Sequence, residues 1–75
     1  MKLHELLLME RRKQEKNQRD IAEKVGISIG YYSRIERGKA DAPLSVLTRI
    51  CEEFGLSISH YVVDKDGGAA VRVEL

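Results

Sequence analysis

Two short apolar patterns meet at a single glycine, Gly26, and this junction restricts the fold more than any other feature of the sequence. Before the junction, Ile21 and Val25 have the spacing of one face of a short helix. After it, Tyr32 and Ile35 have the spacing of a second helical face. Glycine adopts positive φ without steric cost, as a tight corner between two helices requires. The sequence therefore predicts two short helices joined by a sharp turn.

Ala22 supplies the small side chain that crossing helices need where they approach each other most closely. Two helices that cross at about 90–120° and are joined by a short turn form a helix-turn-helix. Ile27 adds an apolar residue inside the corner, and residues 18–37 meet every one of these requirements. An ordinary helical hairpin also favours a small residue and a glycine, but it does not require all of these positions together. We therefore interpret residues 18–37 as a helix-turn-helix.

The helical period predicts five helices in all, over residues 2–14, 18–25, 28–37, 43–54 and 57–63. Asn17 and Ser28 are expected to cap the second and third helices, because their side-chain oxygens can accept backbone N–H groups of the first turn. Asp41 or Ala42 is expected to cap the fourth, with Pro43 in its first turn, where a missing N–H costs little. The inward face of the fourth helix is expected to carry Leu44, Leu47, Ile50, Cys51 and Phe54.

The last residues have a different pattern. Val71, Val73 and Leu75 alternate with polar residues, and this two-residue period is typical of a half-buried strand. A single strand cannot form a sheet alone. We therefore expect it either to pair with a second copy of the chain or to fray. The expected fold is an all-α, compact five-helix domain over residues 1–63, followed by a tail over residues 64–75.

Charge divides the chain into two unequal parts. The whole chain holds 13 Lys and Arg against 12 Asp and Glu, and this near-balance alone does not predict a nucleic-acid partner. Residues 1–40 hold ten Lys and Arg against six acidic residues, whereas residues 41–75 hold three against six. Such a split can mark a basic binding face on an otherwise neutral protein, although it also arises by chance in short chains.

Several other classes of protein are not expected from the sequence. Cys51 is the single cysteine, so no internal disulfide can form, and with His4 and His60 it lacks the paired spacing of a metal site. Charges interrupt the apolar run of the first ten residues, so we expect no signal peptide. No stretch approaches the roughly 20 apolar residues of a membrane span, and the lack of disulfides is typical of a reduced, cytoplasmic protein. No nucleophile–base pair, carboxylate cluster or phosphate-binding loop appears, so neither enzymatic activity nor a cofactor is expected.

A resemblance to the Cro/CI-type (XRE-like) helix-turn-helix family of phage and bacterial repressors is carried by the stretch NQRDIAEKVGISIGYYSRIERGKADAPLSVLTRICEEFGLSISHYV. Its strongest correspondences are Gln18, Ile21-Ala22, Gly26-Ile27, the run from Ser33 to Gly38 and the run from Phe54 to Ser57. With the first helix, the resemblance covers about residues 3–63. It implies a lambda-repressor-like, five-helix domain that binds double-stranded operator DNA, usually as a two-fold dimer. Residues 28–37 would form the recognition helix.

The same resemblance, with the helical geometry of residues 28–37, suggests how the side chains divide on DNA. Arg34 is the best candidate for reading a base, because its guanidinium can bond guanine O6 and N7 together. The positions expected to face base edges are Ile29, Gly30, Ser33 and Arg34. Contacts to the DNA backbone, which set position without reading sequence, are expected from Asn17, Gln18, Ser28, Tyr31, Arg37 and Lys39. For Tyr31, partial packing within the protein is an equal alternative.

The family pattern also implies an ion pair between Arg11 and Glu36 that fastens the first helix to the third. A carboxylate near a helix C-terminus meets an unfavourable dipole, which a guanidinium beside it would offset. Arg12 or solvent is the alternative partner of Glu36. Glu15 and Lys16 depart from the family, which usually has glycine and an apolar residue at these places, so the first helix is expected to run longer or the turn to be more exposed.

These expectations describe a small transcriptional regulator, most simply a repressor that acts as a homodimer on a palindromic operator. The residues expected at the dimer contact are His60, Val62, Val63, Val71 and Val73. The alternative is an antitoxin-type module that binds a partner protein and regulates its own operon. No membrane partner is expected.

Overall fold

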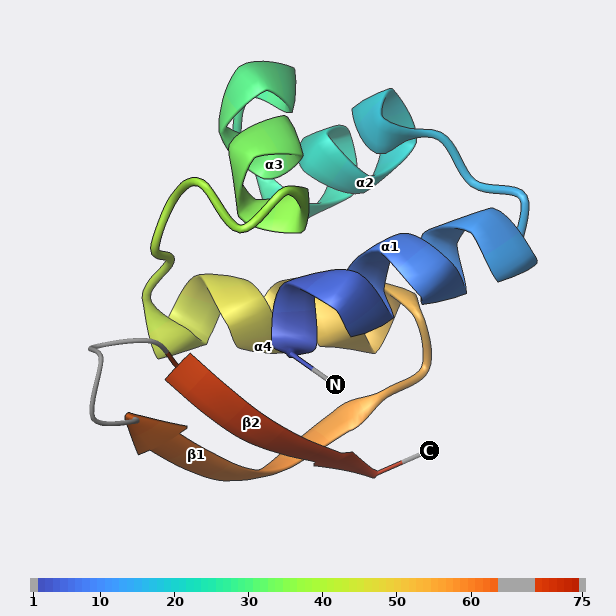
Figure 1. Ribbon diagram of the computed structural model, residues 1–75. Helices are drawn as coiled ribbons and strands as arrows, with labels where there is room; N and C mark the ends of the chain where they lie inside the picture. Colours follow the sequence, from blue (N-terminus) through green and yellow to red (C-terminus); the bar gives the residue numbers. More distant parts are fainter. Residues whose placement is uncertain (1, 64–68, 75) are drawn as a thin grey trace.

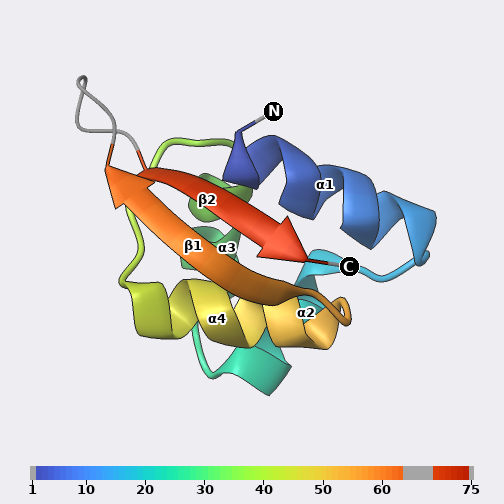
Figure 2. The ribbon, with the colours of Figure 1, turned by 90° about the horizontal axis from the view of Figure 1, so that it is seen from below.

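A computed structural model describes residues 2–63 and 69–74 as four helices followed by a β-hairpin. The elements are α1 (Leu3–Lys13), α2 (Gln18–Val25), α3 (Ile29–Glu36), α4 (Leu44–Glu53), β1 (Ser57–Val63) and β2 (Ala69–Glu74). Helices α2 and α3 lie at one end of the molecule, α1 and α4 form the middle, and the hairpin lies at the opposite end (Figure 1). Seen from that end, the hairpin runs diagonally between α1 and α4, with β2 on the side of α1 and β1 on the side of α4 (Figure 2). The first four predicted helices are thus present, in a lambda-repressor-like arrangement.

The predicted caps of α2 and α3 are confirmed. Asn17 Oδ1 accepts a hydrogen bond from the backbone N–H of Asp20 at 2.8 Å, and Ser28 Oγ accepts one from Tyr31 at 3.0 Å. At the corner between the two helices, Gly26 has a φ of 84°, and its N–H donates to the carbonyl oxygen of Ala22. Because capping bonds of this kind involve neighbouring residues only, they can be predicted from the sequence.

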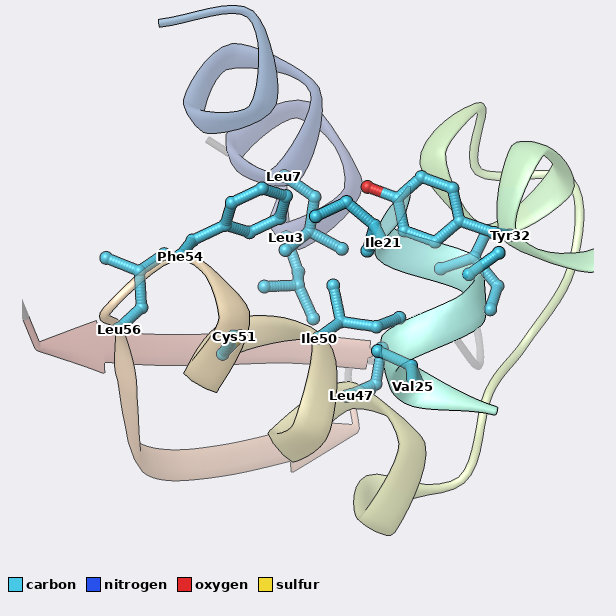
Figure 3. Packing of buried hydrophobic residues seen from close by; sticks show 12 residues of the cluster. Leu3, Leu7, Ile21, Val25, Tyr32, Leu47, Ile50, Cys51, Phe54 and Leu56 are labelled. Atoms are coloured by element: carbon cyan, nitrogen blue, oxygen red, sulfur yellow. The ribbon is translucent and has the colours of Figure 1, made fainter. Parts of the chain in front are cut away.

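All four helices contribute to one apolar core, in which the faces predicted for α2 and α3 are buried (Figure 3). The helical period correctly assigns these faces because their residues repeat on one side of each helix. The buried apolar residues are Leu3, Leu7, Ile21, Ala22, Val25, Tyr32, Ile35, Leu47, Ile50, Cys51, Phe54 and Leu56.

Two details predicted for the start of α4 are wrong. The helix begins at Leu44 with Pro43 at the N-cap position, and no side chain caps it, so neither Asp41 nor Ala42 has that role. Leu44 was expected in the core, but it is 45% exposed, whereas Leu47 is 5% exposed. Periodicity gives the direction of a side chain from the helix axis, but it does not show whether another element covers that turn. Leu44 stays partly exposed in the first turn of α4, whereas Val46 in the same turn packs against the core.

Residues 57–63 form strand β1, so the predicted fifth helix is wrong. Their sequence, Ser-Ile-Ser-His-Tyr-Val-Val, is rich in β-branched and aromatic residues, which favour a pleated strand over a helix. The predicted strand in the tail is present as β2, but neither of its two expected states is observed. It pairs antiparallel with β1 of the same chain, with Ile58 opposite Val73 and Tyr61 opposite Val71. A pairing strand within reach therefore outweighs the helix signal at Ser57.

The hairpin register separates the residues predicted for a dimer contact. His60 and Val62 lie opposite Arg72 and Ala70, one residue out of step with the positions of Val63, Val71 and Val73. Successive positions of a strand alternate between its two faces. The five predicted positions are therefore divided between both faces of the hairpin, and a contact through a single face cannot include them all.

Glu15 has a left-handed backbone with a φ of 56°, and this explains the family's usual glycine there. It follows the C-cap of α1, where the N–H groups of Glu15 and Lys16 donate to the carbonyls of Arg12 and Arg11. This bonding pattern ends a helix most easily with glycine in the left-handed position. The other three helices follow that rule, with glycines of positive φ at their ends. Glu15 is exposed and its side chain has no bond to the other residues that the structure describes.

We expect Glu15→Gly to stabilise the fold by about 0.5–1 kcal/mol. The left-handed backbone costs a non-glycine residue about 1–2 kcal/mol, and glycine relieves this strain. Glycine also loses more conformational freedom on folding, which offsets part of the stabilisation. Urea unfolding followed by circular dichroism measures the difference. Glu15→Ala is the matched control, because alanine removes the same carboxylate and keeps the strained backbone. An equal gain in both variants would contradict the explanation.

Candidate nucleic-acid interface

The outer side of α3 presents most of the residues expected to read bases. The helix buries Tyr32, Ile35 and Glu36 and leaves its opposite side uncovered. Ile29, Gly30 and Arg34 are exposed there, and Ser33 is half-buried. Figure 1 shows α3 beside α2 at the end of the molecule opposite the hairpin. The structure therefore brings these four residues onto one accessible helix.

Exposed positive charge lies along the same end of the molecule. Arg34, Arg37 and Lys39 are exposed, and within residues 2–56 no carboxylate pairs with any of them. The Nε of Arg37 donates to the carbonyl oxygen of Ser33 at 3.3 Å, which holds its guanidinium beside α3. Cations next to an exposed helix are the arrangement that attracts DNA phosphates.

Arg11 and Glu36 form a two-bond ion pair between α1 and α3. The Nε and Nη2 of Arg11 each donate to a different carboxylate oxygen of Glu36, both at 2.8 Å. Arg12, the alternative partner, is exposed. Burial is the largest single influence on the pKa of Glu36 and would raise it, but the hydrogen bonds and charge of Arg11, together with the neighbouring Tyr32 and Gln18, bring that pKa below its usual range. The carboxylate thus stays ionised in a nearly buried site, and the pair fixes the angle of α3 against α1.

Gln18 joins this ion pair from the start of α2. Its Nε2 donates to Glu36 Oε1 at 3.3 Å, so its amide nitrogen is engaged inside the protein. The sequence predicted a phosphate contact for this side chain. The first-turn N–H groups of α2 remain a feature that favours an anion nearby. Gln18 therefore links the start of α2 to the end of α3.

Three other predicted backbone contacts have a structural role as well. The side-chain oxygens of Asn17 and Ser28 accept capping hydrogen bonds, which leaves their own N–H and O–H donors for a phosphate. The Tyr31 hydroxyl donates to the carbonyl oxygen of Asp41 at 3.2 Å, and its ring is half-buried. This bond ties α3 to the segment before α4, so the packing alternative for Tyr31 describes part of its role.

Sequence reasoning missed how residues 14–16 cover the end of α4. The amine of Lys16 donates to the carbonyl of Glu53 at 2.7 Å, and Gln14 Nε2 donates to the carbonyl of Phe54 at 3.0 Å. Cations and amides at a helix C-terminus satisfy carbonyl groups that the helix leaves unpaired. The charge of Lys16 is therefore used within the fold and does not add to the positive surface near α3. The first helix does not run longer than predicted, because α1 ends at Lys13, and the turn is exposed at Glu15 but packed at Gln14 and Lys16.

Two buried groups play no part in this surface. Burial raises the pKa of the Cys51 thiol to about 11, so it stays protonated at neutral pH and unreactive. The Tyr32 hydroxyl faces the Arg11–Glu36 pair but makes no hydrogen bond of acceptable geometry with either residue. The described residues contain no group of three or more His, Cys, Asp or Glu able to hold a metal ion. In the same part of the chain, no helix is long and apolar enough to cross a membrane.

The two short helices that meet at Gly26, with the exposed outer side of α3, define a helix-turn-helix DNA-binding domain. A family model described as helix-turn-helix matches residues 7–61. The chain therefore belongs to the Cro/CI-type (XRE) helix-turn-helix family of DNA-binding regulators, which are not enzymes.

One solved structure that resembles the chain is that of the clp gene regulator ClgR from Corynebacterium glutamicum. The two chains share 31% sequence identity with a TM-score of 0.71. The match covers 73% of this chain and 58% of the ClgR chain, so it leaves a substantial part of ClgR without a counterpart. A search of curated proteins found no match.

Proposed function

We propose that the protein binds a specific operator sequence as a homodimer and represses transcription from it. The observation that carries the proposal is the exposed side of α3, where Arg34 lies with Ile29 and Ser33 beside the exposed cations Arg37 and Lys39, which no carboxylate of residues 2–56 pairs with. A recognition helix of this kind enters the major groove and contacts base edges with its N-terminal residues. A repressor bound at an operator excludes polymerase from the same DNA. The similarity to the regulator ClgR supports a role in transcription.

The size of the molecule supports a dimer. Helix α3 has eight residues and is about 12 Å long, so one copy reaches only a few base pairs. The longest dimension of the chain is 32 Å, close to the roughly 34 Å that separate successive major grooves on one side of DNA. The chain is therefore small enough for two copies to lie side by side at this spacing, with one α3 helix in each groove. Few cations face DNA in each copy, so tight binding benefits from the second copy.

The position of the hairpin limits how two copies can meet. It lies opposite α2 and α3, so joining two copies through its outer face would turn their recognition helices away from each other (Figures 1 and 2). Within this proposal the hairpin therefore contributes to the dimer through a long edge of its two-stranded sheet. Removing residues after 64 would also remove the partner of β1, so such a deletion tests the fold as well as the dimer.

Selection of binding sites from random double-stranded DNA tests the proposal with the intact chain. We expect an enriched sequence made of two inverted half-sites whose centres are about 10 base pairs apart. Sedimentation of the complex should give two chains per site. Absence of any enriched sequence would contradict operator binding, whereas a single half-site with one chain would contradict only the dimer. A reporter controlled by the selected site then checks that expression falls when the protein is present.

Arg34→Ala is expected to change base discrimination, whereas Gln18→Ala is expected to change overall affinity for DNA. Loss of the Arg34 guanidinium should reduce discrimination at one base pair of each half-site by about 1–3 kcal/mol. Loss of the Gln18 side chain should weaken binding to all sequences by a similar factor. The bond from Gln18 to Glu36 helps to hold α3 in place, and the second N–H of its amide is the expected backbone contact, so neither role depends on the base sequence. Competition binding against single-base variants of the selected site measures both. Unchanged affinity and discrimination in both variants would show that α3 does not face DNA as proposed.

A further inference from the structure

We propose that Gly30 is a positioning residue for base recognition. Because it has no side chain, it leaves space at the first turn of α3, so that Arg34 extends towards the N-terminus of the helix and reads a guanine there. This inference rests on the proposed function, because it concerns the same helix. It assigns a base preference to one position of the half-site and names the residue that determines it.

No contact with the residues that the structure describes requires glycine at position 30. Its backbone is helical, whereas Gly26, Gly38 and Gly55 have the positive φ that favours glycine. A Cβ added to Gly30 would meet a single neighbouring atom, Nη1 of Arg34 at 3.8 Å, which is an ordinary van der Waals distance. Glycine in a helix is also less favourable than alanine, because it loses more conformational freedom on folding. The benefit of glycine therefore lies in what α3 contacts.

Arg34 occupies the space that a side chain at position 30 would take. It follows Gly30 by four residues, and helical side chains tilt towards the N-terminus, so its side chain extends back along α3. Its Nη1 lies 3.8 Å from the place of the missing Cβ. The guanidinium thus covers the bare backbone of the first turn, at the end of a recognition helix that meets base edges. A long side chain at position 30 would fill this space and force Arg34 to turn away.

The chemistry of this end of α3 favours guanine. A guanidinium can donate to guanine O6 and N7 together, and this is the base contact that arginine makes most specifically. Ile29 is exposed nearby but has no polar side-chain atoms, and Gly30 has no side chain. Arg34 is therefore the side chain with strong hydrogen-bond donors over the first turn of α3.

The experiment compares the intact wild-type chain with Gly30→Ala, Gly30→Gln, Arg34→Ala and the double variant Gly30→Gln/Arg34→Ala. Each is measured by competition binding against the selected operator and its single-base variants. The wild type should prefer guanine at one half-site position by roughly 5- to 150-fold, the value of a good bidentate contact. Gly30→Ala should keep this preference, because a methyl group fits beside Arg34. Gly30→Gln should lose it or move it to a neighbouring position.

The double variant and a thermal unfolding curve separate positioning from a structural effect. Gly30→Gln should cause no further loss at that position when Arg34 is already alanine, because it acts through Arg34. Both single substitutions of Gly30 should unfold at the same or a higher temperature than the wild type, since alanine and glutamine favour helices. A Gly30→Gln variant that still prefers the operator and keeps the same preference for guanine would overturn this inference and leave the proposed function intact. A wild type without any sequence preference would overturn both.

Discussion

Arg11→Ala is expected to destabilise the protein by about 3–5 kcal/mol, because it leaves a buried carboxylate without its partner. Glu36 is only 3% exposed, and Arg11 supplies two of its hydrogen bonds at 2.8 Å. The hydrogen bond from Gln18 is longer, at 3.3 Å, and its amide donor carries no formal charge. Urea unfolding followed by circular dichroism gives the free energy. A small domain has little stability to lose, so we expect the variant to be partly unfolded at 37 °C.

Arg12→Ala is the matched control, since Arg12 is the next residue of α1, is exposed, and has no side-chain bond to another described residue. Its effect should stay within about 0.5 kcal/mol, as is usual at the surface. The pH dependence gives a second check. The lowered pKa of Glu36 means that the pair stabilises the wild type above the usual glutamate range and that this contribution is lost as the pH falls through the lowered pKa. Without Arg11, burial should raise that pKa, so mild acid should stabilise the variant. Equal losses in both arginine variants would contradict the assigned role.

Leu47→Ala and Leu44→Ala should differ sharply although both change a leucine in α4 to alanine. Leu47 lies in the core, and emptying such a site costs about 2–5 kcal/mol in transfer energy and cavity formation. Leu44 keeps nearly half of its surface in contact with water, so its loss should cost less than about 1 kcal/mol. Chemical unfolding of the two variants in parallel measures the difference. Similar losses would mean that the first turn of α4 is covered after all.

The parts of the fold that the sequence predicted correctly depend on neighbouring residues. Asn17 and Ser28 cap their helices through bonds to residues three positions later, and Gly26 forms the corner through bonds to Ala22. Local rules are enough for such features because the partners are fixed by the chain itself. The helical period likewise identified the buried faces of α2 and α3.

The failures depend on partners that are distant in the sequence. Residues 57–63 form a strand because β2, which comes later in the chain, offers a partner that a helix would not use. Lys16 is packed because the carbonyl group at Glu53 lies across the molecule. In both cases the deciding contact is a tertiary one, and the periodicity of a single segment does not contain it. Leu44 shows the same limit, since burial depends on what lies opposite.

The exposed side of α3 could be predicted from the sequence, because the helix must bury its apolar side in the core and expose the other. Ile29, Gly30 and Arg34 follow from that division. The Arg11–Glu36 pair, which the family resemblance implied, is present, but the hydrogen bond by which Gln18 joins it at the junction of three helices was not predicted. That arrangement depends on side-chain positions that only the assembled fold provides. The Arg34 guanidinium over Gly30 is a further example.

The placement of the hairpin has a practical consequence for constructing fusions. Strand β2 ends at Glu74 on the side of α1 and α4 that faces away from α2 and α3 (Figures 1 and 2). A reporter, a tag or a further domain attached after β2 would therefore extend into solvent away from a duplex held by α3. Near the start of α1, the His4 ring already occupies the space that a side chain on Gly38, just after α3, would need. Operator-binding assays should therefore carry their label at the C-terminal end.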